Sequence, residues 1–469
     1  MDLKELKLMI EENDVTAIDL KYCDTVGMWR HLTLPIEKLD YILKYGLILD
    51  HCQHIKTVNN EELVIIPDID TAVIDDNYNT ISIICTVHDK KTAKGAKCDP
   101  RSIALRAKEY LASSGIADES CWIPELRFYA FDEADFYSSK FSSAYQFTSI
   151  QNKYCLPDSY EDSDAISAQD INARNINSPL DSKFSLRQDI VDCLIDKNIK
   201  ISCHSHDDGL AGQQRIMPEL MPFPKAADAV LIAKDITKHL ALEYRASITF
   251  MPKPIYNEPG SGMHFHVQLK QNNINLFYEK GRYADLSHTA LYFIGGILQH
   301  GASLAAFTNP STNSYRRLFA SPDEPSKLFY GFANKLAAIS VPKSANTEEE
   351  KRIEIKFADA TSNPYLAMSA ILMAGLDGIK NQIHPNELGY GPYEDDINQW
   401  SKEMQDAIKS MPNSLEEALN ALKADHQYLL AGNVFDKDFI KSWIDLKMKE
   451  VVAINQRPHP YEMTMYYNL

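Results

Sequence analysis

Four short segments of this chain alternate polar with apolar residues at a period of two. They cover residues 124–129, 202–206, 262–268 and 352–357. Because successive side chains of a strand point to opposite faces, each segment predicts a strand with one polar and one apolar face. Strand faces that meet water usually carry Thr, Ser and Lys, whereas these carry His, Glu and Arg. The pattern therefore predicts a sheet that presents chemically active groups to a site.

The residues on these polar faces favour metal and phosphate chemistry. Carboxylate and imidazole groups are ligands for Mg²⁺ or Mn²⁺, and cations that face inward suit phosphate oxygens. For any single strand, one solvated sheet face is the better interpretation, and it is the occurrence of all four together that favours a site. The polar residues are Glu125, Arg127, His204, His206, His264, His266, Arg352, Glu354 and Lys356.

Composition excludes several classes of partner. The 469 residues include 48 Lys and Arg against 65 Asp and Glu, which gives a net charge of −17. Such acidity argues against nucleic acid and against anionic membrane surfaces. There is no export segment and no apolar run of about 20 residues, and the eight cysteines form no CxxC pair. We therefore expect a cytoplasmic protein with reduced thiols.

The chain divides into two predicted units, residues 1–97 and 98–469. The first is β-rich, with strands expected at 17–20, 28–35, 62–66 and 80–87 and a helix at 36–45. Asp99 and Pro100 then open a helix, because Asp caps helix N-termini well and Pro suits the first turn.

The second unit is expected to alternate strands with long helices. Helices are predicted at 225–245, 364–382, 415–424 and 437–448, the first two strongly amphipathic, and the polar residues 132–187 are expected to form a long loop. The aromatic tail 459–469 admits two interpretations. It folds back on its own domain, or it docks as a strap on another subunit.

Short motifs follow one another along nearly the whole chain, at residues 24–31, 99–104, 249–254, 260–266, 309–318, 352–354 and 363–366. In content and order they resemble the type I glutamine synthetases. This resemblance implies an α+β fold: an N-terminal β-grasp domain, then a catalytic domain with a curved antiparallel sheet flanked by helices. It also implies a homo-oligomer, a dodecamer of two hexameric rings.

The resemblance implies ATP-dependent joining of a carboxylate to an amine with two divalent ions, Mg²⁺ or Mn²⁺. One ion would be held by Glu125, His264 and Glu354, which are all present. The nucleotide-side residues would be His266, Arg352 and Lys335, although Lys335 stands where the family has arginine. The catalytic residues implied are Asp50, Arg317 and Asp323, with Glu324 as the alternative to Asp323.

The second metal site departs from the family pattern. Its three glutamate positions are Arg127, Asp208 and Arg215 here. A guanidinium is a permanent cation that cannot ligate a metal, so we infer that the second ion is absent and replaced by arginine charge. Arg127 would also repel the α-ammonium group of glutamate, which predicts a different carboxylate substrate. The substrate-binding residues expected are Arg127, Arg215, Asp208, Gly260 and Lys356.

Three hypotheses follow for the function. The first is a divergent ATP-dependent ligase, or an enzyme that forms an acyl phosphate, acting on a small carboxylate other than glutamate. The second is a catalytically inactive homologue with a binding or regulatory role. The third is an active glutamine synthetase in which Asp207 or Glu219 replaces a lost ligand.

Overall fold

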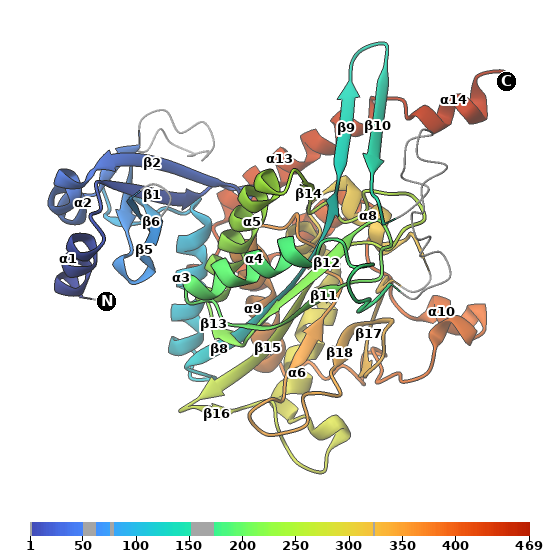
Figure 1. The fold of residues 1–469 in the computed structure, drawn as a ribbon. Coiled ribbons are helices and arrows are strands. Elements are labelled where there is room, and N and C mark those ends of the chain that lie inside the picture. The colour runs from blue at the N-terminus through green and yellow to red at the C-terminus, as the bar shows by residue number, and fades with distance from the viewer. Residues whose placement is uncertain (1, 50–61, 76–78, 152–172, 322–323) are drawn as a thin grey trace.

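The computed structural model describes residues 2–49, 62–75, 79–151, 173–321 and 324–469. A small N-terminal sheet lies beside a larger sheet that is packed with helices (Figure 1). Among these residues no single helix is long and apolar enough to cross a bilayer. One bent pair, α6 (His288–Gln299) and α7 (Gly301–Thr308), meets that length and composition together.

The N-terminal sheet has the strand order β2-β1-β6-β4-β3. β1 and β6 run parallel, and the other neighbours in this order run antiparallel. The predicted strands and the predicted helix are all present, and α1 (Leu3–Glu12) precedes them. The elements are β1 (Ala17–Cys23), β2 (Trp29–Pro35), α2 (Leu39–Tyr45), β3 (Leu47–Leu49), β4 (Leu63–Pro67) and β6 (Thr80–Asp89).

α3 (Pro100–Ser113) begins where the sequence predicts, capped by Asp99, which accepts the backbone N–H of Ser102 at 2.8 Å. In the first turn of the helix, the buried Arg101 donates to Asp228 at 3.0 and 3.1 Å and to Asp68 at 2.8 Å. A buried guanidinium needs such partners to offset its lost hydration. Arg101 thus ties the N-terminal sheet to the helices of the larger part.

The large sheet has the order β11-β12-β8-β15-β19-β18-β17, antiparallel except for the pair β17 and β18. With the β-grasp sheet and the flanking helices, it confirms the predicted α+β fold. Its strands are β8 (Glu119–Phe131), β11 (Ile201–His206), β12 (Gln213–Pro218), β15 (Met263–Gln271), β17 (Lys327–Phe332), β18 (Ala337–Val341) and β19 (Ile353–Ile355).

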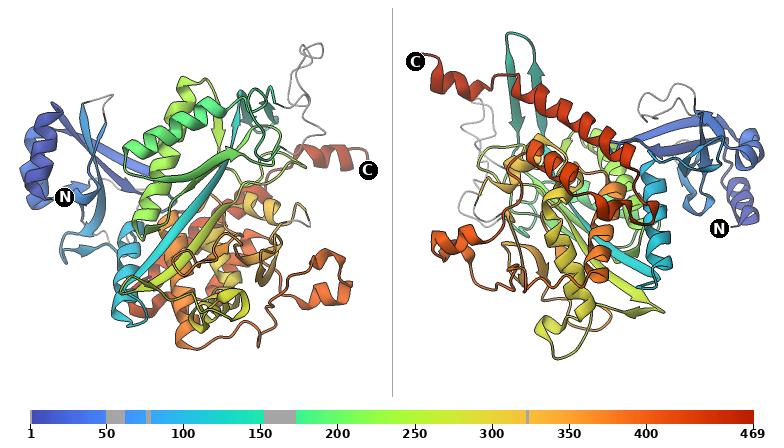
Figure 2. Two further views of the ribbon diagram at one scale, coloured as in Figure 1. Left: turned by 60° about the horizontal axis from the view of Figure 1, so that its bottom comes forward. Right: turned by 180° about the vertical axis from the view of Figure 1, so that it is seen from behind.

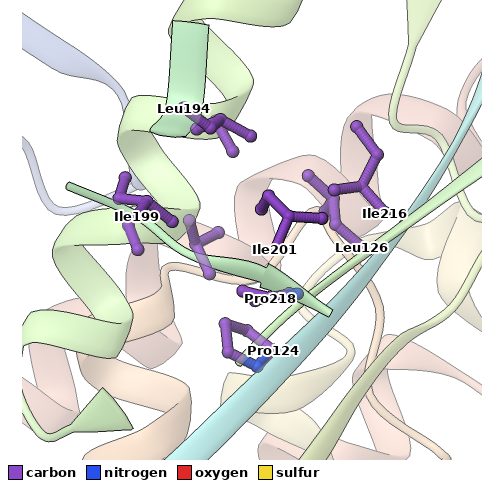
Figure 3. Close-up of a pocket in the computed structure, with 10 residues that line it drawn as sticks. Pro124, Leu126, Leu194, Ile199, Ile201, Ile216 and Pro218 are labelled. Carbon is purple, nitrogen blue, oxygen red and sulfur yellow. The ribbon is translucent and has the colours of Figure 1, made fainter. Parts of the chain in front are cut away.

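The two faces of β8 have different neighbours. Pro124 and Leu126 point toward α4 (Phe184–Asp196) and α5 (Lys225–Glu243), where they line an apolar cavity of about 20 Å³ with Leu194 and Ile216 (Figure 3). Since side chains alternate along a strand, Glu125 and Arg127 lie on the opposite face. The helices therefore cover the back of the sheet, and the polar groups face away from them.

α9 (Pro364–Lys380) packs against α3, α5, α6 and α7. Asn363 caps it by accepting the backbone N–H of Tyr365 at 3.1 Å. Its existence is as predicted, but its amphipathic character is not, because nearly all of its residues are buried. A helix surrounded by other helices needs no solvated face. α11 (Leu415–Ala424) and α13 (Lys437–Asn455) also form as expected, and α13 is longer than predicted.

The prediction of a long loop at 132–187 is wrong at both ends of this range, residues 132–151 and 173–187, which the structure describes. β9 (Glu133–Ser138) and β10 (Ser143–Thr148) pair as an antiparallel hairpin that projects from the body (Figure 1), and α4 begins at Phe184. The polar composition conceals a period of two along this hairpin. Ser139 and Ser142 close the turn through hydrogen bonds. Residues 152–172 lie outside the described part.

The C-terminal tail does not fold back on its own chain. All residues 454–469, including α14 (Pro460–Tyr466), are exposed, and the helix extends away from the body (Figure 2). Its exposed side chains include Tyr461, Met463, Tyr467 and Leu469. This contradicts the first of the two interpretations, and docking on another subunit stays a prediction.

Candidate active site

Three neighbouring strands bring Glu125, His264 and Glu354 together on the open face of the sheet. His264 of β15 lies opposite Glu125 of β8, and His266 lies opposite Glu354 of β19. Nδ1 of His264 lies 2.9 Å from Oε1 of Glu354 and 3.9 Å from Oε1 of Glu125. The predicted ligand set is therefore one cluster in space, although Glu125 and Glu354 lie more than 200 residues apart in the sequence.

The expectation that all four polar faces line one site is wrong for β11. This strand pairs with β12 so that Ser205 lies opposite Arg215. Because neighbouring residues point to opposite faces, His204 and His206 lie on the side of the sheet covered by α4. Nδ1 of His204 accepts a hydrogen bond from Arg187 of α4 at 3.0 Å. Register, which the alternation alone does not fix, decides this placement.

Arg127 lies inside the carboxylate cluster. Its Nε and Nη2 donate to Oε1 of Glu125 at 3.0 and 2.8 Å, and Nε lies 3.1 Å from Oδ2 of Asp207. Asp207 is only 1 % exposed. Two carboxylates thus bracket one buried guanidinium. Glu219, the other replacement ligand considered, is exposed beyond the end of β12 and lies away from this cluster.

Arg215 lies directly across from Arg127 in the pairing of β12 with β8. Its Nη1 is 4.0 Å from Oε2 of Glu125. Its Nε is buried and has no hydrogen-bond partner within the described ranges. Arg215 therefore adds a cation that makes no hydrogen bond to any residue in the described ranges.

Asp208 is held by Arg174, a residue that the sequence analysis missed. Arg174 donates from Nε at 2.9 Å and from Nη2 at 2.5 Å to the two oxygens of Asp208, and Nη2 lies 3.3 Å from Asp207. The loop that carries Arg174 has no periodic pattern, so no sequence signal placed it here. Three arginines and three carboxylates consequently alternate along this edge of the site.

The local charges set the protonation states of the cluster. Burial alone would raise the pKa of Glu125, but Arg127 and the two histidines lower it to about 2. Burial, assisted by Arg127, lowers the pKa of His264 to about 4. Burial would also raise the pKa of Glu354, yet its hydrogen bond with His264 and the nearby cations hold it well below its usual range. At neutral pH the carboxylates are ionised and the imidazole is neutral.

These protonation states are the ones that metal ligation requires. Within the part of the chain that the structure describes, no group of three or more His, Cys, Asp and Glu side chains is already arranged to hold an ion. Arg127 donates a hydrogen bond to Glu125, and a second hydrogen bond joins His264 to Glu354. The donor set of these three ligands still suits one Mg²⁺ or Mn²⁺ once the bond between His264 and Glu354 opens. Nearby His266 is buried, and neither of its ring nitrogens has a partner in the described ranges.

Arg317 is 2 % exposed and braces the loop beside the cluster. Its Nη1 donates to the carbonyls of Phe357 and Ala358 at 3.0 Å each, and Nη2 donates to the carbonyl of Lys356 at 2.9 Å. A Cβ at Gly260 would lie 2.6 Å from Cγ of Arg317. The missing side chain of Gly260 therefore lets this loop pack closely against Arg317, and substrate binding by Gly260 stays a prediction.

The remaining cations lie along the strands β18 and β19. Nζ of Lys356 donates to the carbonyls of Asn334 and Lys335 at 2.7 and 2.9 Å, so it supports the turn between β17 and β18. The side chain of Lys335 is exposed. Nη1 of Arg352 donates to the carbonyl of Glu350 at 3.0 Å. Arg352 and Lys356 flank Glu354 along the same strand segment.

Comparison with known families agrees with this arrangement. Residues 97–466 match the catalytic domain of glutamine synthetase, and residues 14–90 match its beta-grasp domain. The chain belongs to the glutamine synthetase family.

Relatives and solved structures of the family cover the chain from end to end. The glutamine synthetase of Streptomyces filamentosus is 37% identical over 469 residues, which span 99% of both chains. That of Haemophilus influenzae is 37% identical over 465 residues, 98% of this chain and 97% of its own. The Plasmodium falciparum glutamine synthetase structure has a TM-score of 0.87 at 26% identity, covering 100% of this chain and 99% of its own. A ligand-free GmaS structure shares the fold, with a TM-score of 0.80 at 21% identity over the full length of both chains.

Two of the predicted catalytic residues, Asp50 and Asp323, lie outside the described residues. Their roles stay predictions from the glutamine synthetase resemblance. Glu324, the alternative to Asp323, has Oε2 3.5 Å from Nε of Arg317. A carboxylate of this loop therefore lies beside the residue that was expected to contact substrate.

Proposed function

We propose that this member of the glutamine synthetase family is an ATP-dependent carboxylate–amine ligase that uses one divalent ion and a carboxylate other than glutamate. The observation that carries the proposal is the contact of Arg127 with Glu125 and Asp207. It puts a permanent cation where the family resemblance implies a metal-binding glutamate. The neighbouring set of Glu125, His264 and Glu354 is complete.

The proposed roles of the site residues follow from their charges. Glu125, His264 and Glu354 would hold Mg²⁺ or Mn²⁺, which supplies charge neutralisation for the phosphate oxygens of ATP. Arg352 and Lys335 extend this positive region toward the nucleotide. The substrate carboxylate takes the γ-phosphoryl group, and an amine then displaces phosphate to form the C–N bond. Gly260 and Arg317 hold the loop beside the carboxylate in place.

Glutamate itself is a poor fit for this site. Its α-ammonium group would meet the guanidinium groups of Arg127 and Arg215, which lie opposite each other on neighbouring strands. Like charges in a partly dry site repel by several kcal/mol, even at an effective dielectric constant of about 20. This supports a substrate that lacks the ammonium group.

One observation favours a non-catalytic homologue as the second candidate. Oε1 of Glu125 already accepts two hydrogen bonds from Arg127, which compete with metal ligation. In that case the protein would bind a metabolite or a partner without turnover.

Release of ADP separates the two candidates. The full-length protein is incubated with ATP, Mg²⁺, a panel of carboxylic acids and ammonia or simple amines. A ligase releases ADP with at least one pair, and Glu354→Ala abolishes the signal because it removes a metal ligand. The distant variant Arg282→Gln, in an exposed pair with Glu279, serves as the control. Absence of ADP release across the panel would favour the non-catalytic homologue, and turnover of glutamate with ammonia at an ordinary enzymatic rate would refute the altered specificity.

We also propose that the subunits assemble as two stacked hexameric rings. The family resemblance implies this dodecamer. The exposed aromatic residues of the tail and of the hairpin β9–β10 support it, since exposed aromatic surface of this kind suits burial against another subunit.

A further inference from the structure

The arginines around Glu125 are not equivalent. Arg127 uses its donors on Glu125 and Asp207, and Arg174 uses its donors on Asp208 and Asp207. Arg215 makes no hydrogen bond inside the described part of the chain, and its one ionic contact is at the long distance of 4.0 Å. The protein therefore neutralises two arginines with its own carboxylates and leaves the third with unused donors.

The charges around Arg215 disfavour a cationic ligand group. Arg127 lies directly across from Arg215, and within the described residues the carboxylate in ionic contact with Arg215 is that of Glu125, at 4.0 Å. Glu125 also pairs with Arg127 at 2.8 Å, so the charge of Arg215 is only weakly offset. A half-buried guanidinium with unused donors attracts an anion, and its planar fork matches a carboxylate through two parallel hydrogen bonds.

We propose that Arg215 determines specificity by binding the second carboxylate of a dicarboxylic acid that has no α-ammonium group. This inference rests on the proposed ligase function and names its substrate class. Arg215 lies next to Glu125, so a group held by Arg215 leaves the other end of a short acid beside the predicted metal ligands. Arg127 differs from Arg215 because two carboxylates, Glu125 and Asp207, already offset its charge. Arg127 acts as a positioning residue for Glu125.

Calorimetric titration of the full-length protein, with and without Mn²⁺, tests the inference using three acids of related shape. Glutarate carries two carboxylates, butyrate carries one, and glutamate carries two with an ammonium group. We expect glutarate to bind about 10 to 100 times more tightly than butyrate, which corresponds to one charge-assisted contact of about 1.5–3 kcal/mol. Glutamate should bind at least about tenfold more weakly than glutarate, because its ammonium group faces the arginines.

Variants assign the effect to one side chain. Arg215→Gln should remove most of the advantage of glutarate and leave butyrate unchanged, and Arg215→Lys should restore part of it. The matched control Arg282→Gln should bind all three acids as the wild type does. Because Arg215 makes no hydrogen bond to the residues that the structure describes, Arg215→Gln should keep the wild-type circular dichroism and melting temperature. That result would separate a change in binding from misfolding.

Two results would overturn the inference: glutarate binding no more tightly than butyrate, or an unchanged glutarate affinity in Arg215→Gln. Both results can be distinguished from a result that refutes the proposed ligase activity. Selective glutarate binding without ADP release from any acid refutes catalysis alone. ADP release from a monocarboxylate that is insensitive to Arg215→Gln refutes the dicarboxylate inference alone.

Discussion

Arg127 shows how one residue changes the chemistry of an otherwise complete site. The sequence places a guanidinium on the same strand face as Glu125, two residues away, and this proximity was predictable from the period of a strand. Its contact with Asp207 and the role of Arg174 were not predictable, because both depend on loops that have no periodic pattern. The arginines that are predicted to replace the second metal ion therefore take part in ion pairs that the sequence does not indicate.

Removing the Arg127 charge should destabilise the fold. Arg127→Gln breaks both ion pairs and leaves the buried Glu125 with Arg215 at 4.0 Å and the buried Asp207 with Arg174 at 3.3 Å, which costs about 3–5 kcal/mol. Urea denaturation followed by tryptophan fluorescence measures this loss. The exposed control Arg282→Gln should cost less than about 1 kcal/mol, since its pair is surface-bound. A loss below about 1 kcal/mol in Arg127→Gln would contradict the structural role given to the pair.

At the scale of elements, alternation predicted the strands well but not which strands share a site. The register of β11 against β12 turns His204 and His206 toward α4, and only the paired backbone fixes that register. The hairpin β9–β10 was hidden by polar composition. The helix at 364–382 was predicted, yet its full burial depends on helices that come from distant parts of the sequence.

His300 joins three helices and should make their packing depend on pH. It lies at the bend between α6 and α7, with Nδ1 2.8 Å from Asp425 and Nε2 3.1 Å from Asp377 of α9. Burial alone would lower the pKa of His300, but these two carboxylates raise it to about 9. The folded protein thus binds this proton more tightly than the unfolded chain, in which the pKa is about 6.5.

His300→Gln should therefore destabilise the protein most at low pH. The stabilisation from the charged imidazole is fully present below about pH 6.5 and is lost as the pH rises through about 9. Because the carboxylates are partly exposed, we expect a difference of about 2 kcal/mol at pH 6. Urea denaturation of both proteins between pH 6 and pH 10 measures it. A difference that stays constant over this range would show that the pair does not titrate.

At the scale of the whole molecule, the fold was predictable because many short motifs occur in family order. The active-site account was predictable only in part. Asp50 and Asp323 lie outside the described residues, so their roles stay predictions. The assembly into rings also stays a prediction, because a single chain shows no contact between subunits.

Deletion of residues 460–469 tests the assembly. The deleted segment makes α14 and exposes apolar side chains along its whole length, so it should stabilise contacts between subunits. We expect a smaller sedimentation coefficient in analytical ultracentrifugation at the same protein concentration. The double variant Lys4→Gln, Lys7→Gln in the exposed part of α1 should sediment as the wild type does. An unchanged mass after the deletion would argue against a role for the tail in assembly.

We propose that Arg127 and Arg215 replace one metal ion while Glu125, His264 and Glu354 bind the other. Equilibrium dialysis of the full-length protein against Mn²⁺, without nucleotide, counts the bound ions per subunit. We expect one ion per subunit, which disappears in Glu354→Gln. Two ions per subunit would contradict the replacement of a metal by arginine, and no bound ion would contradict the retained site.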